Sequence, residues 1–300
     1  MTILQLKYVI ALANSTSMRE AASRLFISQP ALSSTIRELE EELQIQIFER
    51  TNRGIKLTEL GNEFLAYAKQ AVSQYKVIED RYIEKDKDKR HFSVSMQHYV
   101  FAVHAFVHTV KLYKDSNYSY SVHETRTDEV LNNVKNMKSE IGVIAYSNSN
   151  EKVMKKLFRE YGLQFIPLMT RNTYVYVWKK HPLAEKSKLS LKELEDYPCV
   201  SFDQNSESEF YLSEEALGNY DFHKLIKTND RATSAELMAE LNGYSIGTGN
   251  MTESIALNDG FVSIKLKEED PLMIGYIVRK NHTISDIGKT YIEELIKYKE

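Results

Sequence analysis

Hydrophobic positions near the N-terminus recur at helical spacing and predict three short helices. The first runs from Ile3 to Ala13 and the second from Met18 to Leu25. The third begins at Ser28, a favourable N-cap, and carries Pro30 in its first turn, where a missing N–H does little harm. Its apolar side would pack on the other two helices, and its opposite side carries Gln29, Ser33, Ser34 and Arg37.

That polar side decides between two interpretations of the three helices. Short polar side chains near the start of a helix can enter the major groove of DNA and hydrogen-bond to base edges. Arg37, farther along, would then reach the flanking phosphate backbone. The alternative is a small helical bundle whose polar side only meets water, and the spacing alone favours DNA binding over it.

A longer apolar stripe between Thr58 and about Lys85 predicts one long helix. About 28 residues at 1.5 Å each make a rod roughly 40 Å long, which a small domain cannot cover by itself. A partner helix is expected to cover it, and packing on the chain's own C-terminal half is the alternative. Six consecutive charged residues, 85–90, then mark a solvated hinge and domain boundary.

Strand and helix patterns alternate beyond residue 91 and predict an α/β domain. Strands over 92–96, 118–124 and 140–146 are separated by helices over 99–113 and 127–137. This succession is typical of a parallel sheet with helices on both faces. Further strands are expected over 165–169, 174–178, 199–202, 244–248, 261–266 and 272–279, and further helices over 234–241 and 284–298.

Composition narrows the class of protein. Three hundred residues, 42% of them apolar and 27% charged, allow two or three folded units. A net charge of −3 argues against indiscriminate coating of nucleic acid, although five of the twelve arginines fall within the first 53 residues. The single cysteine, Cys199, excludes an internal disulfide and favours a reducing compartment. No stretch is apolar enough to span a membrane, so we expect a cytoplasmic protein without a membrane partner.

The run from Ser17 to Ser33, SMREAASRLFISQPALS, resembles the helix-turn-helix of the LysR-type transcriptional regulators. The similarity continues through Ile36–Glu40, Phe48–Arg50 and Leu57–Gly61, which makes it long and specific. It implies a wing whose tip is formed by 50–54. The DNA-contacting residues that the pattern and the resemblance together indicate are Ser28, Gln29, Pro30, Ser33, Ser34, Arg37, Arg50, Asn52 and Arg53.

The resemblance also implies partners. The protein would bind double-stranded operator DNA with dyad symmetry, as a homodimer joined through the long helix and further assembled into a homotetramer. RNA polymerase is a candidate partner. Ser34 and Thr35 stand where many relatives carry arginine or glutamine, so the operator sequence cannot be carried over.

The C-terminal half resembles the LysR-type effector domain more loosely, through His181–Ala184, Leu191–Leu194 and Gly243–Gly247. That domain is similar to periplasmic binding proteins, with two α/β lobes hinged around a cleft. The domains implied are an all-α winged helix-turn-helix over 1–58, a linker helix and hinge over 59–90, and an effector domain over 91–300, with lobe one at 91–162 and 268–300 and lobe two at 163–267.

Candidate effector-binding residues follow from the rule that open α/β sheets bind ligands beyond the carboxyl ends of their strands. They are Ser95, Gln97, His98, Tyr99, Arg126, Thr127, Tyr146, Ser147, Ser201, Phe202, Thr248 and Asn250. Arg126, which precedes a helix N-terminus, and His98 would suit a carboxylate or another anion. We therefore expect a small-molecule effector, with an anion as one candidate, and no other cofactor.

Single residues suggest other possible functions. Cys199 could be a redox switch, but the chain offers no second cysteine to resolve it, and its setting is apolar. His104 and His108 share a helix face without the further ligands of a metal signature. A cysteine-dependent enzyme and a solute-binding transport protein are further alternatives. No phosphate loop or nucleophile elbow supports the first, and the helix-turn-helix opposes the second.

Overall fold

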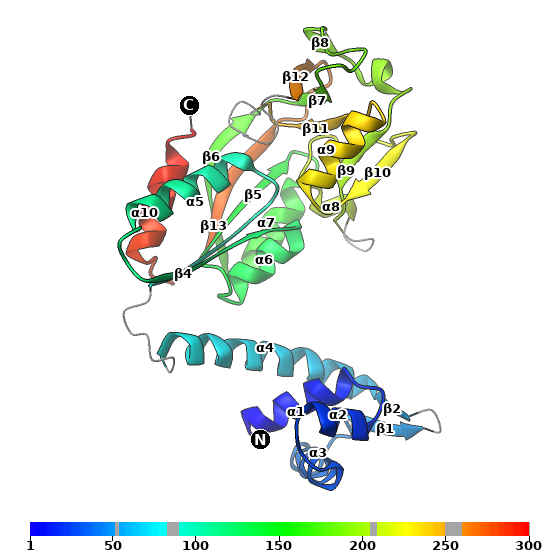
Figure 1. Cartoon of the computed structure of the whole chain (residues 1–300), viewed down its shortest axis with the longest axis vertical. Helices are drawn as coiled ribbons and strands as arrows, with labels where there is room; N and C mark the ends of the chain where they lie inside the picture. Colours follow the sequence, from blue (N-terminus) through cyan, green and yellow to red (C-terminus); the bar gives the residue numbers. More distant parts are fainter. Residues whose placement is uncertain (52–53, 83–89, 205–208, 250–259, 300) are drawn as a thin grey trace. The chain divides into compact units, whose positions relative to one another are not determined.

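A computed structural model describes the chain except for residues 52–53, 83–89, 205–208, 250–259 and 300 (Figure 1). The chain separates into two compact units, Met1–Lys87 and Asp88–Glu300. Each unit has a hydrophobic core of its own. In the described residues, no helix is long and apolar enough to cross a bilayer.

The first unit opens with the three short helices that the hydrophobic pattern predicts, and the structure confirms them. They are α1 (Ile3–Ala13), α2 (Met18–Arg24) and α3 (Gln29–Leu43). The predicted N-cap is present, because the Ser28 hydroxyl accepts a hydrogen bond from the Ala31 N–H at 3.3 Å. The apolar side of α3 is buried against α1 and α2 through Leu32, Ile36 and Leu39.

A two-stranded hairpin, β1 (Phe48–Thr51) and β2 (Gly54–Leu57), follows α3. The Glu40 carboxylate fixes its entry, accepting hydrogen bonds from the backbone N–H groups of Ile47 and Phe48 at 2.7 and 2.9 Å. Gly54, expected in the turn itself, is instead the first residue of β2 and pairs with Thr51. Residues 52–53 between the strands lie outside the described residues.

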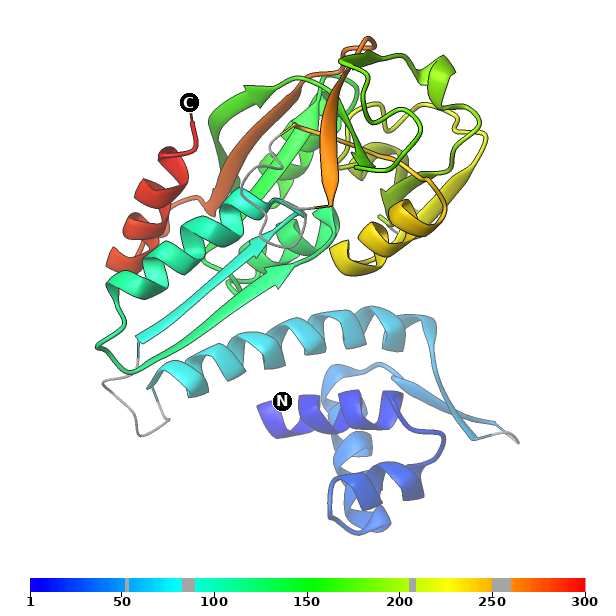
Figure 2. The ribbon, with the colours of Figure 1, turned by 45° about the horizontal axis from the view of Figure 1, so that its top comes forward.

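The predicted long helix is α4 (Glu59–Tyr82), capped by the Thr58 hydroxyl, which accepts from the Gly61 N–H at 2.9 Å. Gly61 is required here because a Cβ at this position would lie 2.0 Å from the carbonyl oxygen of Ile47. One side of α4 packs on α1 (Figure 2), and Ala68 is fully buried there. Thus α1 covers part of the apolar stripe within the same unit.

The second unit contains a five-stranded sheet in the order β4-β3-β5-β13-β6. Its strands are β3 (Arg90–Met96), β4 (Tyr118–Glu124), β5 (Ile141–Ser147), β6 (Leu163–Arg171) and β13 (Leu272–Arg279). The expected parallel arrangement holds for β3, β4 and β5, whereas β13 runs antiparallel to both of its neighbours. The sheet is therefore mixed, because β13 re-enters it from the opposite end.

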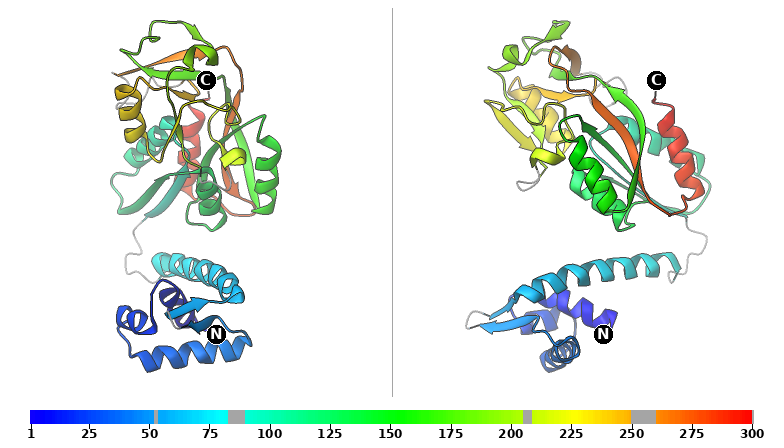
Figure 3. Two further views of the ribbon diagram at one scale, coloured as in Figure 1. Left: turned by 90° about the vertical axis from the view of Figure 1, so that its right-hand side faces the viewer. Right: turned by 180° about the vertical axis from the view of Figure 1, so that it is seen from behind.

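Helices cover both faces of this sheet, as expected (Figures 1 and 3). One face packs on α5 (Val100–Leu112) and α10 (Asp286–Ile296), and the other on α6 (Thr127–Lys135) and α7 (Glu151–Glu160). Strand β5 is buried along its whole length. It alternates between the two cores, because Val143 faces the α5 and α10 side while Ile144 faces α6 and α7.

The second lobe is built on a four-stranded sheet in the order β11-β7-β12-β8 and a parallel pair, β9 and β10. Its strands are β7 (Tyr174–Trp178), β8 (Lys188–Leu189), β9 (Cys199–Phe202), β10 (Leu225–Thr228), β11 (Ser245–Gly247) and β12 (Phe261–Leu266). Its helices are the short 3₁₀ helix η1 (Leu191–Leu194), α8 (Glu209–Leu212) and α9 (Arg231–Glu240).

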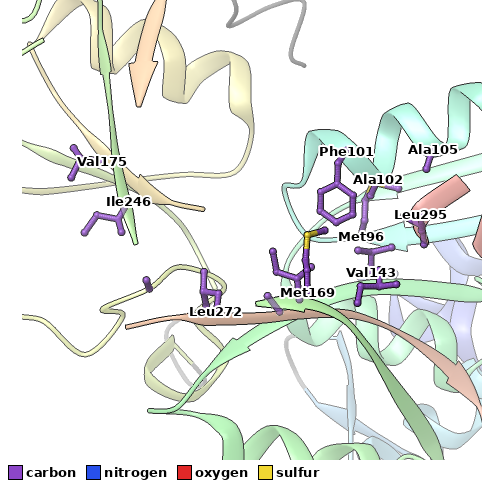
Figure 4. Packing of buried hydrophobic residues seen from close by; sticks show 14 of the residues in the cluster. Met96, Phe101, Ala102, Ala105, Val143, Met169, Val175, Ile246, Leu272 and Leu295 are labelled. Atoms are coloured by element: carbon purple, nitrogen blue, oxygen red, sulfur yellow. The ribbon is translucent and has the colours of Figure 1, made fainter. Parts of the chain in front are cut away.

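The crossing between the lobes differs from the expected one. Residues 163–171 were expected in lobe two, but β6 pairs with β13 in the first sheet, so the chain leaves lobe one only after Arg171. The two crossing segments are tied together, because Thr173 Oγ1 accepts a hydrogen bond from the Asp270 N–H at 2.9 Å. One hydrophobic cluster continues through both lobes, with Leu272 between Val175 and Ile246 on one side and Met96 and Met169 on the other (Figure 4).

Candidate functional site

The start of α3 presents the polar side that the sequence predicts. Ser28, Gln29 and Pro30 are exposed, and Ser33 and Ser34 are half-buried. None of the five is enclosed in the core, so this end of the helix is open to solvent. Their roles in DNA contact stay predictions.

Arg37 lies farther along the same helix and is held only loosely. Its side chain is 74% exposed, and its nearest carboxylate partner is Glu41, with Nε and Oε1 3.6 Å apart. Exposed i,i+4 pairs of this kind contribute little free energy. A phosphate could therefore replace Glu41 as the partner of this guanidinium at small cost.

The wing is described only in part. Arg50 pairs with Ile55 in the hairpin, which places its backbone in β1. Asn52 and Arg53, expected at the wing tip, lie outside the described residues.

A row of large apolar side chains remains exposed along α4. Leu60, Tyr67 and Ile78 are 52%, 64% and 51% exposed. They are separated by 7 and 11 residues, close to two and three whole turns of an α-helix at about 3.6 residues per turn, so they share one side. This row, the α4 stripe, lies beside the part of the helix that packs on α1. An uncovered apolar row of this length is typical of a helix that pairs with another helix.

A cavity of about 110 Å³ opens between the two lobes of the second unit. Lobe one contributes the end of β3 and the start of α5, and lobe two contributes β7, β11, α9 and the loop before Ala216. The predicted effector residues His98, Tyr99, Phe202 and Thr248 line it. The other lining residues are Val100, Phe101, Tyr176, Glu214, Glu215, Arg231, Ser234, Met238, Ser245, Ile246, Gly247 and Leu272.

Three predicted effector residues brace the fold instead of lining this cavity. Ser95 is fully buried and hydrogen-bonds through its hydroxyl to that of Ser139 at 2.7 Å. Gln97 donates to the Thr127 hydroxyl at 2.5 Å and accepts from the backbone of β5. The Thr127 N–H donates to Gln204 Oε1 at 3.0 Å, which makes a bond between the lobes. Ser95 lies within β3, near its end, and Gln97 and Thr127 follow strands, but all three side chains bond to other parts of the protein.

Four more predicted effector residues lie elsewhere. Tyr146 belongs to the hydrophobic core between the sheet and α7. Ser147 closes a local turn by donating its N–H to the Asn150 side chain at 2.9 Å. Ser201 donates its hydroxyl to the Glu215 carboxyl and lines a second cavity of about 130 Å³, which shares Phe202, Glu215 and Ile246 with the first. Asn250 lies outside the described residues.

Arg126, the residue on which an anionic effector most depended, does not line the cavity. Its guanidinium donates to Glu129 Oε1 at 2.9 Å and lies 3.7 Å from Asp128 Oδ1. Both carboxylates come from the first turn of α6, which Arg126 itself precedes. The N-terminus of α6 is therefore already stabilised by its own acidic side chains. Arg126 no longer supports the prediction of an anionic effector.

His98 and Glu214 form the electrostatic centre of the cavity. His98 Nδ1 lies 2.5 Å from Glu214 Oε1, and both side chains are almost fully buried. The imidazole stacks on the Phe202 ring, with centroids 3.7 Å apart and planes 2° from parallel. Burial lowers the pKa of His98, but the Glu214 carboxylate outweighs it with further acidic neighbours, and the net pKa is raised above 6.5. The protonated imidazolium is therefore the form that this pair favours.

Glu215 stands next to this pair and behaves differently. Burial, opposed by the Ser201 hydroxyl and reinforced by Glu214, raises the pKa of Glu215 to about 8. At neutral pH this carboxyl is therefore mainly protonated. The two carboxyl groups are adjacent in the cavity wall, and the neighbouring Glu214 adds to the effect of burial on the pKa of Glu215.

Arg231 is the other cation of the cavity, and it too has a partner. Its Nε and Nη2 donate to the two oxygens of Glu124 at 2.7 and 2.5 Å, a bidentate pair from α9 to the end of β4. Arg231, Glu214 and Glu215 were not among the residues predicted from the sequence. The N-cap Asp230 before Arg231, which accepts from the Thr233 N–H, was the available signal for a helix starting there. No comparable sequence pattern marks Glu214 and Glu215.

The remaining single-residue hypotheses can be compared with the structure. Cys199 is 2% exposed in β9, and burial raises its pKa well above the ordinary value, which disfavours the reactive thiolate. His108 Nδ1 lies 3.4 Å from Glu294 on α10, across the pair of helices. Among the residues that the structure describes, no group of three or more histidine, cysteine or acidic side chains could hold a metal ion.

Comparison with known families agrees with this two-unit architecture. The model for bacterial regulatory helix-turn-helix proteins of the lysR family matches residues 3–62. The model for the LysR substrate binding domain matches residues 114–298. The fold and its two sites thus define a transcriptional regulator that joins a DNA-binding helix-turn-helix to an effector-binding domain. The chain belongs to the LysR family.

The individual relatives compared here have low sequence identity to this chain. A hydrogen peroxide-inducible genes activator of Haemophilus influenzae is 24% identical over 267 residues, which span 87% of this chain and 83% of that one. The crystal structure of CbnR, a LysR family transcriptional regulator, matches with a TM-score of 0.66 at 18% identity and covers 100% of both chains. Full-length CbnR complexed with its target DNA matches with a TM-score of 0.66 at 17% identity, over 99% of both chains. The predicted fold class is confirmed.

Proposed function

We propose that this regulator binds a dyad-symmetric operator as a homodimer and that a small molecule in the cavity between the lobes controls the outcome. The observation that carries the DNA part is the start of α3, where Ser28 caps the helix and the neighbouring polar side chains are accessible. Gln29 and the serines at 33 and 34 are of the size and polarity that base edges require. Arg37 and the wing residues Arg50, Asn52 and Arg53 supply the phosphate and minor-groove contacts of the proposal.

The dimer is proposed to form through the α4 stripe. Two copies of α4 that bury Leu60, Tyr67 and Ile78 against each other would present two α3 helices to successive major grooves. Half-sites separated by one helical turn, or a multiple of it, follow from that symmetry. Further assembly into a tetramer, contact with RNA polymerase and residence in the cytoplasm belong to the same proposal and rest on family membership.

The ligand is proposed to act on the geometry of the complex. A ligand that binds better to one arrangement of the lobes shifts the population toward it, and the dimers within a tetramer then pair differently. Half-site spacing and DNA bending would change, while binding itself persists. Footprints on the operator with and without a ligand that stabilises the second unit should therefore differ, and identical footprints at saturation would contradict this part.

A gel-shift assay with the DNA upstream of the protein's own gene tests the DNA proposal. Gln29→Ala should weaken specific binding about 10-fold, the loss expected for one good side-chain contact to a base. Gln164→Ala makes the same change at an exposed position of β6 in the other unit and should leave the affinity unchanged. Absence of any specific shift, or equal losses in the two variants, would refute the assignment of α3 as the reading helix.

The structure gives no support to the alternative of redox sensing through Cys199. The thiol is buried, its pKa is raised, and the chain has no second cysteine with which to form a disulfide. No catalytic activity is proposed, because the family matched by both halves of the chain is one of regulators.

A further inference from the structure

Two buried polar atoms of residues that line the cavity have no hydrogen-bond partner among the residues that the structure describes. His98 Nε2 and Glu214 Oε2 are both buried, and neither is paired. The opposite atoms of the same side chains, Nδ1 and Oε1, are paired with each other at 2.5 Å. Both residues line the cavity, and each side chain therefore keeps one buried hydrogen-bonding position that no described residue fills. A buried polar atom without a partner destabilises the protein. The binding free energy of a ligand that pairs with both atoms is more favourable because it removes this destabilisation.

The two unpaired atoms need different hydrogen-bond partners, one an acceptor and the other a donor. With His98 protonated, its Nε2–H is a donor and needs an acceptor from the ligand. The free oxygen of the Glu214 carboxylate accepts only, so it needs a donor such as an N–H or O–H. A ligand that satisfies both walls must therefore carry a donor and an acceptor.

The charges around the cavity are already balanced. The imidazolium of His98 is paired with Glu214, and the guanidinium of Arg231 is paired with both oxygens of Glu124. Glu215, with a pKa of about 8, adds no charge at neutral pH. A carboxylate ligand would place a second anion beside Glu214, and the described lining residues offer no unpaired cation to meet it. A cationic ligand would enter beside His98 and Arg231. Both carry a desolvation cost that an uncharged ligand avoids.

Apart from Ser234, Ser245 and Thr248, most of the remaining lining is apolar or aromatic, and it favours a flat ligand body. Phe202 already stacks on His98 in parallel planes, and Tyr176, Met238 and Ile246 contribute further apolar surface. Aromatic rings and a methionine accommodate a planar group well.

We propose that the effector is a compact uncharged molecule with a flat apolar body and a donor beside an acceptor, the chemistry of carboxamides and lactams. Its N–H donates to Glu214 Oε2 and its carbonyl oxygen accepts from His98 Nε2–H. The inference rests on the proposed role of this cavity as the effector site. It replaces the anionic effector that Arg126 had suggested.

Three probe molecules of similar shape test whether the cavity prefers an uncharged, a negatively charged or a positively charged ligand. Benzamide carries a donor and an acceptor without charge, benzoate carries acceptors and a negative charge, and benzamidine carries donors and a positive charge. Titration calorimetry on the full-length protein at pH 7 should detect benzamide, with at least 10-fold weaker binding of the other two. Tighter or equal binding of benzoate or benzamidine, or no binding of benzamide, would overturn the proposal.

Variants then locate the site. Glu214→Gln removes the acceptor-only oxygen pair and should weaken benzamide binding about 10-fold. Glu151→Gln makes the same change at a surface carboxyl that pairs with Lys155 on α7, and should leave benzamide binding as it was. If Glu214→Gln does not fold, as judged from Trp178 fluorescence, His98→Gln provides the same test from the other wall. Unchanged affinity in a folded variant would show that benzamide binds elsewhere.

The two proposals fail separately. The gel-shift assay without ligand tests DNA binding, and calorimetry without DNA tests the chemistry of the cavity. Benzamide binding by a protein that does not shift its upstream DNA would refute the proposed function only. A specific shift with no benzamide binding would refute the inference about the ligand only.

Discussion

Replacing Glu215 with glutamine should make the stability of the second unit less sensitive to pH. The carboxyl of Glu215 has a pKa of about 8 in the folded protein, against an ordinary value of 4.5. Between these values the unfolded chain releases the proton while the folded chain keeps it. The stability that this group contributes is therefore fully present below pH 4.5 and is lost as pH rises to about 8.

The structure sets the size of the effect. Each unit of pKa difference corresponds to about 1.4 kcal/mol, so the whole window is worth roughly 5 kcal/mol. Glutamine keeps a polar group beside the Ser201 hydroxyl and the Phe202 N–H but cannot ionise. The free energy of unfolding of Glu215→Gln minus that of the wild type should therefore rise by about 1.4 kcal/mol per pH unit between pH 5 and 8, then level off.

Trp178 makes this measurable in the full chain. It is the single tryptophan of the protein and lies in β7, so its fluorescence reports unfolding of the second unit. Urea titrations at a series of pH values give the two unfolding free energies. Glu151→Gln, a surface carboxyl on α7, is the matched control and should show no such slope. A difference between Glu215→Gln and wild type that stays flat from pH 5 to 8 would refute the argument that this carboxyl is held protonated.

Three further outcomes concern the first unit. Arg37→Ala should weaken binding to all DNA sequences and lower the slope of log affinity against log salt by about one, and an unchanged slope would remove Arg37 from the phosphate contacts. Tyr67→Glu should raise the dimer dissociation constant at least about 10-fold in analytical ultracentrifugation, because it places like charges in the α4 stripe. Ser73→Glu, exposed elsewhere on α4, is its control, and equal effects would exclude the stripe as the interface. Gly61→Ala should destabilise the first unit by about 1–3 kcal/mol, since its Cβ would clash with the Ile47 carbonyl, and hydrogen exchange in α4 would detect this.

The first unit could be predicted from its sequence because local signals and packing agree there. Ser28 caps α3, Leu32 and Ile36 recur at helical spacing, and the same residues form the core in the structure. The hydrophobic pattern did not show which apolar residues of α4 pack within the first unit and which stay exposed. Ala68 packs within its own unit while Tyr67, one position away, stays exposed, and periodicity alone does not tell which neighbour covers which residue.

The cavity could be predicted only in part, for a physical reason. The rule of strand ends gives positions along the chain, but it does not give the direction of each side chain. His98 and Tyr99 after β3 do face the cavity, whereas Gln97, immediately before them, turns inward to hold Thr127 and β5. A polar residue at a strand end is drawn into the protein when a buried donor or acceptor needs it, and that partner comes from another element.

The contacts between the lobes explain how a ligand could act through so small a site. Glu214 of lobe two gives one oxygen to His98 of lobe one, and its other oxygen has no hydrogen-bond partner among the described residues. Arg231 reaches across to Glu124 in the same way, and Gln204 accepts from the Thr127 N–H. A ligand that bonds to the free atoms of His98 and Glu214 can do so together only while these lobes are in contact. The binding free energy of the ligand therefore adds to that of the contacts between the lobes. The arrangement with the lobes in contact is favoured over one with the lobes apart by the difference between the affinities of the ligand for the two arrangements.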